Sequence, residues 1–200
     1  MEEQRRSNPK AAQVRIESRS AGSYTGQRKH DLRIGAQPAY VDADRMADNE
    51  TVIEPPRPGA LREINEVRRS QRDTKRAMKS NASLAFVGIL TFGTEAQAIF
   101  EALPREPHDV QREAFEDAAR AVAERLNTTL VGLVIHRDET APHAHFTLPA
   151  YDLDGQPLTK TVKRSTLSDL QDVVAAAFQK HAPQIERGRS VAERLQAGAV

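Results

Sequence analysis

The feature that most limits how this chain can fold is a pair of apolar segments, residues 130–135 and 143–148, with a short polar connection over residues 137–142. The first segment is continuously apolar and rich in β-branched side chains, which is typical of a buried central strand. The second alternates between polar and apolar residues with the two-residue period of a strand. Because the connection is far too short for a crossover between parallel strands, the two segments are expected to pair antiparallel.

Three histidines fall where these strands would bring them together. His136 follows the first strand, and His143 and His145 share one face of the second. Imidazole is the commonest side-chain ligand of divalent transition metals, and three of them leave coordination positions open, as catalytic sites do. A lone His-x-His pair is more often a surface or core feature, but the third histidine and the carboxylates of Asp138 and Glu139 favour a metal site.

The ligand types limit the choice of ion but do not settle it, because three imidazoles suit Mn, Zn, Ni or Co, and Mg is less suited to imidazole. We expect one divalent ion, and Mn is our first choice among these. Glu139 is expected in the loop above the histidines, and Asp138 is expected to orient an imidazole from behind.

Periodicity predicts the remaining elements. Strands are expected at residues 14–18 and 84–92, with a turn at 152–155 and a short strand ending at 158. Helices are expected at residues 61–79, 97–103, 110–126 and 166–181, with another starting over 190–197. Residues 22–58 are expected to be loop with short elements at most. The predicted fold is α+β, with a mainly antiparallel central sheet, helices on one face and the metal site on the other.

Length and composition predict a single domain with short ends. We expect a disordered tail over residues 1–12, a catalytic domain over 13–188 and a C-terminal extension over 189–200. The chain has no cysteine, which excludes disulfides and thiolate metal ligands. No apolar run approaches the roughly 20 residues that span a membrane, and the charged N-terminus is unlike a signal peptide, so a cytoplasmic protein is expected.

The histidine segment resembles the metal motif of the Mob/Pre family of plasmid mobilisation relaxases, within the wider HUH endonuclease group. That motif reads His-x-Asp-Glu, three residues, His-x-His, then a Pro and an Asp-Gly or Asn-Gly turn. The matching positions here are His136, Asp138, Glu139, His143, His145, Pro149, Asp154 and Gly155. The resemblance spans about residues 14–188 and includes a Glu-Arg-Gly at residues 186–188.

A second, weaker match lies upstream. His30 and Arg33 occupy the first and last positions of the family's His-Asn-x-Arg, with Asp31 in place of the Asn. The resemblance implies that His30 is the nucleophile, whereas Tyr24 and Tyr40 are rivals because tyrosine is the commoner nucleophile in the wider group. Arg33 would hold the phosphate, and Glu139 would accept a proton or orient His30.

The resemblance implies a function. It is a metal-dependent, site- and strand-specific DNA nicking–closing reaction at a plasmid transfer origin, with a covalent 5′-phospho-protein intermediate, in the cytoplasm of a bacterium. The partners would be single-stranded or hairpin DNA of that origin and other mobilisation proteins.

Basic residues predict where DNA would bind, because Lys and Arg neutralise phosphates. An ordinary solvated helix face with internal ion pairs is the alternative for the stretch over residues 57–79. The expected DNA-binding residues are Arg28, Lys29, Arg45, Asn49, Arg68, Arg69, Arg72, Lys75, Arg76 and Lys79.

Two other functions remain open on sequence grounds. One is a metal-dependent hydrolase of a small substrate, with Glu139 as base and no need of His30. The other is a non-catalytic single-stranded or hairpin DNA-binding module of replication or recombination.

Overall fold

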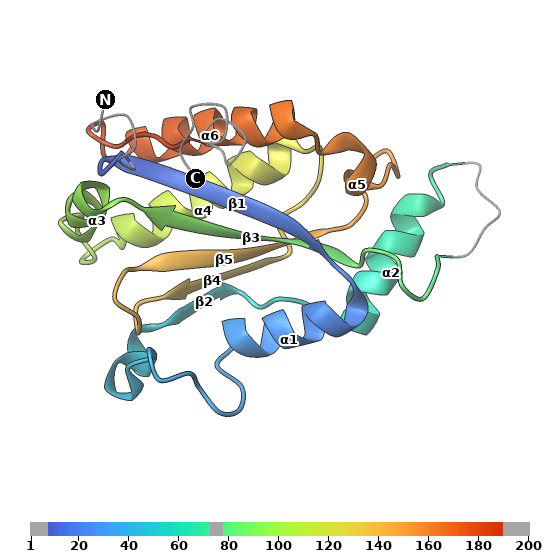
Figure 1. Ribbon diagram of the computed structural model, residues 1–200, viewed down its shortest axis with the longest axis horizontal. Coiled ribbons are helices and arrows are strands. Elements are labelled where there is room, and N and C mark those ends of the chain that lie inside the picture. Colours follow the sequence, from blue (N-terminus) through green and yellow to red (C-terminus); the bar gives the residue numbers. More distant parts are fainter. Residues whose placement is uncertain (1–7, 73–77, 190–200) are drawn as a thin grey trace, which may run out of the picture.

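The computed structural model describes residues 8–72 and 78–189. Figure 1 shows a central sheet with helices packed around it. The strands are β1 Ala11–Arg19, β2 Glu50–Ile53, β3 Ala85–Phe92, β4 Gly132–His136, β5 His143–Pro149 and β6 Glu186–Arg187. The helices are α1 Ala21–Asp31, the 3₁₀ turn η2 Ala43–Asp48, α2 Pro58–Arg69, α3 Thr94–Glu101, α4 Val110–Arg125, α5 Leu158–Thr161 and α6 Arg164–Gln179.

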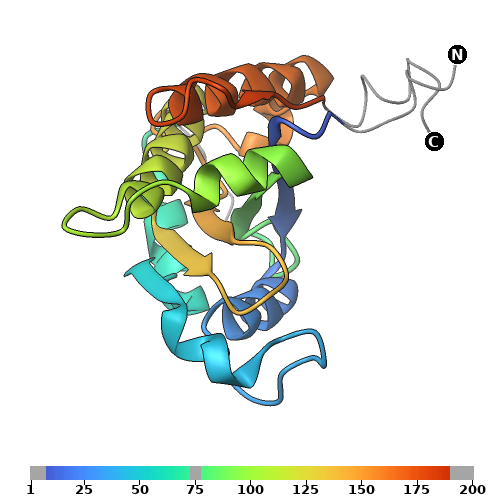
Figure 2. The same cartoon turned by 90° about the vertical axis from the view of Figure 1, so that its left-hand side faces the viewer.

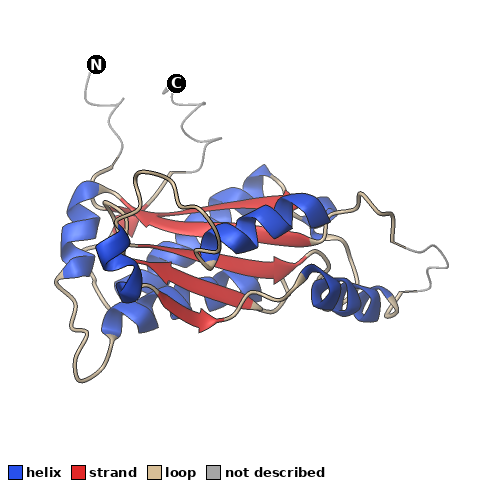
Figure 3. Cartoon of the chain, turned by 90° about the horizontal axis from the view of Figure 1, so that it is seen from below, coloured by secondary structure: helices blue, strands red, loops and turns tan. Residues whose placement is uncertain are grey.

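The sheet has six strands in the order β2-β4-β5-β3-β1-β6. Every neighbouring pair is antiparallel except β1 with the two-residue β6, which is parallel. The strands lie side by side across the molecule when it is seen from below (Figure 3). The predicted α+β class and mainly antiparallel sheet are therefore confirmed.

One face of the sheet carries the main core. The α4 stripe of Phe115, Ala118, Ala119 and Val122 has the helical spacing that points a continuous apolar surface at the strands. Together with α6 and α3 it covers the apolar side chains of β3 and β5, and all four of these α4 residues are fully buried. The Asp109 side chain accepts a hydrogen bond from the Arg112 N–H and so caps the start of α4.

The opposite face, which carries the histidines, is partly covered by α1 and α2. Figure 2 shows α4 and α6 on one side of the sheet and α1 on the other. Tyr24 of α1 is fully buried in a second, smaller core with Leu61 of α2 and Val87 of β3. The helices are therefore not confined to one face as predicted, because α1 lies across the metal face.

The expectation of loop over residues 22–58 is wrong at its start, where α1 forms. This helix has two glycines and a single large buried apolar side chain, Tyr24, so it lacks an apolar stripe that periodicity could detect. Its contacts with the sheet, rather than its own propensity, hold it in place.

Several predicted boundaries also shift. β1 begins at Ala11 and buries Ala11 and Ala12, which the predicted tail had included. α2 ends at Arg69, ten residues before the predicted end at residue 79. The strand expected to end at Leu158 is replaced by a single bridge between Tyr151 and Pro157 and then by α5. Residues 1–7 of the tail and the helix predicted from residue 190 lie outside the described residues.

Candidate metal centre and its surroundings

The pairing of β4 with β5 places the histidines as the sequence predicted. In this register His136 lies opposite His143, and Val134 lies opposite His145. The ring centres of His136, His143 and His145 are 5.0 to 5.1 Å apart in all three pairs. Imidazoles that share one ion at a metal–nitrogen distance of about 2.1 Å have ring centres on the order of 5 Å apart, so this spacing suits a common ion.

Hydrogen bonds to backbone carbonyls fix the tautomers of two rings. His136 Nε2 lies 2.8 Å from the Asp31 carbonyl oxygen, and His143 Nδ1 lies 3.0 Å from the Ala141 carbonyl oxygen. Each of these nitrogens must donate, because a carbonyl oxygen only accepts. The lone pairs of His136 Nδ1 and His143 Nε2 therefore face each other at 3.3 Å, an arrangement that a cation stabilises.

The third ring has a free nitrogen in the same region. His145 Nδ1 lies 3.6 Å from the Asp31 carboxylate, while His145 Nε2 is buried without a hydrogen-bond partner among the described residues. A buried acceptor without a partner is costly, and a metal ion would satisfy it. The residues present thus fit a divalent ion.

Burial keeps His136 and His145 neutral, as metal ligands must be. Burial, opposed by the hydrogen bond to the Asp31 carbonyl, lowers the pKa of His136 to about 3. Burial and then the neighbouring histidines hold the pKa of His145 well below its usual value. His136 therefore stays uncharged near neutral pH, which leaves its Nδ1 lone pair available to a cation.

Two sets of side chains bring one ligand atom per residue within 4.8 Å of one another: His30 with His136 and His145, and His136 with Glu139 and His143. The predicted triad is thus divided between the two sets, with His136 common to both. The first set adds His30 and the second adds Glu139, two residues that the sequence analysis assigned to catalysis rather than to metal binding.

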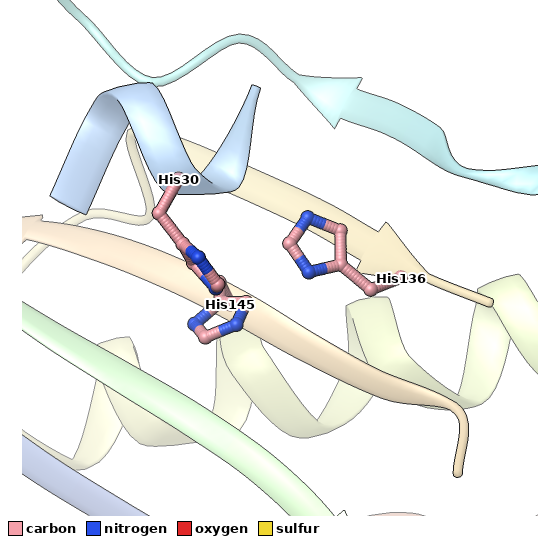
Figure 4. A group of neighbouring side chains, drawn as sticks. All are labelled: His30, His136 and His145. Atoms are coloured by element: carbon pink, nitrogen blue, oxygen red, sulfur yellow. The ribbon is translucent and has the colours of Figure 1, made fainter. Parts of the chain in front are cut away.

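His30 reaches the cluster from the last turn of α1, more than 100 residues away in the chain (Figure 4). Its ring centre lies 5.1 Å from that of His145 and 5.5 Å from that of His136. Within the described part of the chain, its ring nitrogens make no hydrogen bond. Burial and then the charge of Arg33 lower the pKa of His30, so the ring is neutral at neutral pH.

Arg33 lies just beyond α1 and connects this helix to the metal-motif loop. Its Nε and Nη2 donate to the two Asp138 carboxylate oxygens at 2.8 and 2.6 Å, and Nη2 also donates to Glu139 at 2.8 Å. Asn49 donates to Asp138 at 2.6 Å and accepts from the Arg137 N–H at 2.7 Å. Asp138 therefore holds Arg33 and Asn49, and the prediction that it orients an imidazole is wrong.

The two rival tyrosines have different surroundings. The Tyr24 hydroxyl donates to the Pro56 carbonyl oxygen at 2.8 Å, and burial raises its pKa to about 12. Tyr24 is thus a packing residue far from ionisation. Tyr40 is 60 % exposed and lines a cavity of about 310 Å³ with Glu139 and His143.

The predicted DNA-binding residues separate into two groups. Near His30, Lys29 is exposed, and Arg45 is exposed with its guanidinium 3.4 Å from the Glu139 carbonyl oxygen. Arg28 is half-buried and binds Glu54 and the Pro55 carbonyl oxygen, while Asn49 belongs to the Asp138 network.

The basic stretch of α2 is not beside the histidines. Figure 1 places α2 next to the start of α1, whereas His30 lies in its last turn. Arg68 is buried and hydrogen-bonds to Thr128 and Thr129, and Arg69 is buried, pairs with Glu66 and lies 5.7 Å from the Tyr151 ring centre. These two arginines stabilise the fold, contrary to their predicted role. Arg72 is half-buried and Lys79 exposed, while Lys75 and Arg76 lie outside the described residues.

Sequence reasoning did not anticipate the contacts of Asp31. Its carbonyl and carboxylate face two of the histidines, and Gln27 donates to the carboxylate at 2.7 Å. The sequence showed that Asp31 replaces the Asn of the family motif. Only helix α1, which was not predicted, brings Asp31 to the histidines.

Fold and site first define a class: an α+β protein whose antiparallel sheet presents a histidine-rich candidate metal centre, as expected for an HUH-type enzyme. The chain belongs to the Mob_Pre family, described as plasmid recombination enzyme, whose model matches residues 9–198. The resemblance stated from the motifs is thereby confirmed.

Solved structures share this fold. The MobM relaxase domain bound to plasmid pMV158 oriT DNA, with Mn bound at pH 5.5, superposes with a TM-score of 0.73 at 22 % identity, covering 94 % of this chain and 99 % of that chain. The same domain on 26-nucleotide oriT DNA gives 0.65 at 21 % identity, covering 92 % and 98 %. No curated protein sequence matches. Across the described residues, no helix is long and apolar enough to cross a membrane.

Proposed function

We propose that the chain is a relaxase that nicks and rejoins one strand of DNA at a plasmid transfer origin. The observation that carries this function is His30, a neutral imidazole without a hydrogen-bond partner among the described residues, beside a cluster of metal-ligand type. A small-substrate hydrolase that uses metal-activated water does not need an imidazole without a hydrogen-bond partner at this position. Family membership and the oriT complexes of the matching relaxase domains support the proposal.

His136, His143 and His145 would hold one divalent ion, and Mn is the first choice because the matching relaxase domains contain it. When bound there, the ion would neutralise charge on a phosphate of the DNA and make its phosphorus a better electrophile.

His30 would supply the nucleophile. One ring nitrogen attacks the phosphorus in line, a P–N bond forms, and the bond from phosphorus to the 3′-oxygen breaks. The departing strand leaves with a 3′-hydroxyl after taking a proton, and the 5′ end stays on the protein as a phosphoramidate. The low pKa of His30 favours this step, because an imidazole must be neutral to attack.

Glu139 and Arg33 would assist from the loop and the end of α1. The Glu139 carboxylate lies within the electrostatic reach of His30, so it can take the proton that the phosphorylated ring loses. Arg33 Nη1 is buried without a partner among the described residues, so it remains available to donate to a phosphate oxygen. Exposed Lys29 and Arg45 would bind phosphates that flank the cleaved one. The reaction would take place in the bacterial cytoplasm, and other mobilisation proteins would be partners.

The test is a nicking assay on the full chain. Labelled single strands from DNA adjoining the gene are incubated with Mn²⁺, with and without chelator, and resolved on a denaturing gel. We expect a metal-dependent nick with label attached to protein, its loss in His30→Ala, and its retention in Tyr24→Phe and Tyr40→Phe. An acid-stable phosphotyrosine would overturn the role of His30.

Two results would favour the other functions. Binding of DNA hairpins without cleavage, unchanged by metal, would indicate a non-catalytic DNA-binding module. Wild-type turnover of a small phosphoester by His30→Ala would indicate the hydrolase.

A further inference from the structure

We infer that Asp31 is a positioning residue that orients His136 and His145 toward the metal, using its main chain for one ring and its side chain for the other. The inference rests on the proposed function, because it concerns the ion that the relaxase reaction would use. Asp31 is not itself a candidate ligand, since neither set of convergent ligand atoms includes it.

The main-chain contact comes from the end of α1. The last carbonyl oxygens of a helix have no partner within the helix, and the Asp31 carbonyl takes the His136 Nε2–H at 2.8 Å. This bond directs His136 Nδ1 toward His143 and the space between the rings. A substitution of the Asp31 side chain leaves this contact in place.

The side-chain contact is separate. The Asp31 carboxylate lies 3.6 Å from His145 Nδ1 and is 3 % exposed. Gln27, one helical turn earlier, donates to the same carboxylate oxygen at 2.7 Å and so fixes its position. An N–H on His145 Nδ1 directed at the carboxylate leaves Nε2, which is buried and has no partner in the described chain, as the nitrogen that faces the ion.

The buried carboxylate of the metal loop, Asp138, is not free to orient an imidazole. Asp138 is fully buried and is occupied by Arg33 and Asn49. His143 is oriented by the carbonyl oxygen of Ala141. Among the described residues, Asp31 is therefore the carboxylate that sits behind a ligand imidazole.

A carboxylate behind a metal-bound imidazole fixes the ring and raises the basicity of the nitrogen that holds the metal, and loss of such a partner typically weakens metal affinity by about 10- to 100-fold. We expect Asp31→Asn to weaken Mn²⁺ binding by about tenfold or more, since the amide keeps the shape and loses the charge. Gln27→Leu should weaken binding less, because it loosens the carboxylate without removing it.

The test is direct titration of Mn²⁺ into the chelator-treated full chain, followed by the electron paramagnetic resonance of free Mn²⁺, together with thermal unfolding of the metal-free protein. Asp152→Asn is the matched control, since Asp152 is also buried and hydrogen-bonded but lies beyond the far end of β5 from His143. Asp31→Asn should keep or raise the unfolding temperature of the metal-free protein, because a buried carboxylate loses hydration that an amide does not need. Its nicking should recover at saturating Mn²⁺.

The outcomes separate the proposals. Wild-type Mn²⁺ affinity in Asp31→Asn would overturn the role of Asp31 while leaving the proposed function intact. If Asp31→Asn lowered the stability of the metal-free protein as much as it lowered the free energy of Mn²⁺ binding, Asp31 would be a structural residue, and the positioning role would also be overturned. Absence of Mn²⁺ binding in the wild type would remove the metal centre and this inference together, whereas Mn²⁺ binding without nicking would contradict the relaxase function alone.

Discussion

Arg33 combines a strained backbone with a buried ion pair. Its φ of +52° lies in the left-handed region, which costs a side-chain-bearing residue roughly 1 kcal/mol. The turn lets the Ile34 N–H bond back to the Lys29 carbonyl oxygen at 2.8 Å and ends α1 just after His30. The two hydrogen bonds to Asp138 hold the guanidinium in place, so the position of His30 depends on a contact with the metal loop.

We expect Arg33→Ala to destabilise the fold by about 3–5 kcal/mol, because it leaves the fully buried Asp138 without its cation. The measurement is urea unfolding of the metal-free protein. Asp138→Ala and the double variant complete the cycle. The double variant should lose less than the sum of the two single losses, and simple additivity would show that the pair is not coupled.

At the residue scale, the sequence predicted the groups but not their connections. The spacing of His136, His143 and His145 followed from strand period alone, so their convergence could be predicted. The tautomers, the partner of Asp138 and the contacts of Asp31 depend on carbonyls and side chains from distant segments. No local pattern encodes those contacts.

At the element scale, the β3–β5 pair shows how closely the sheet is packed beneath the histidines. Gly88 pairs with Phe146, and a Cβ at Gly88 would lie 2.1 Å from the Phe146 ring. The glycine therefore makes room for a ring that belongs to the main core.

Gly88→Ala should destabilise the protein by about 1–3 kcal/mol, the usual cost of overpacking a core. Gly26→Ala in α1 is the matched control, since nothing lies within 4 Å of its Cβ position and alanine favours a helix by about 1 kcal/mol. Thermal unfolding should move in opposite directions for the two variants. Equal behaviour would mean that the Phe146 ring moves aside without cost.

Helix α1 was the element that sequence patterns missed, and Tyr24 explains why it forms. We expect Tyr24→Phe to cost about 1 kcal/mol, through the lost hydrogen bond to Pro56, and to leave nicking unchanged. Tyr24→Ala should cost about 3–5 kcal/mol through the cavity it leaves. Urea unfolding and the nicking assay measure the two effects, and loss of nicking in Tyr24→Phe would restore Tyr24 as a nucleophile.

At the scale of the whole molecule, the buried histidines make the metal-free protein sensitive to acid. The pKa of His136 falls from 6.5 to about 3 on folding, so the unfolded chain binds more protons in that range. Stability therefore falls as the pH is lowered through this range, and His145 acts in the same direction. Asp31 acts in the opposite direction, because its pKa rises from 3.8 to about 7 on folding.

His30 also has a lowered pKa, so three histidines act against one carboxyl group, and the unfolding temperature of chelator-treated protein should fall between pH 6.5 and pH 4. Asp31→Asn should make that fall steeper, because the opposing group is gone. The check is a series of thermal unfolding curves at constant ionic strength. A flat profile would mean that these histidines are accessible to protons in the folded state.

Metal should stabilise the whole fold by mass action. An ion at 100 times its dissociation constant adds about 2.7 kcal/mol if it binds the folded state alone. We expect Mn²⁺ to raise the unfolding temperature of the wild type and His145→Ala to remove most of that rise. A similar rise in both proteins would place the bound ion elsewhere.

The fold class could be predicted at this scale because one short connection forced an antiparallel sheet. The placement of α1 and α2 on the metal face could not be predicted. Their positions depend on a second core, built around Tyr24 and Leu61, whose members lie far apart in the sequence.

The bond between His136 and the Asp31 carbonyl joins residues 105 positions apart. During translation His30 and the Asp31 carbonyl emerge first, and the imidazole cluster does not exist until the segment after residue 145 has left the ribosome and paired. At a synthesis rate of about 5–20 residues per second, this interval lasts several seconds or more. Under the proposed mechanism, a growing or prematurely terminated chain would therefore carry His30 without the metal cluster that its attack on DNA requires.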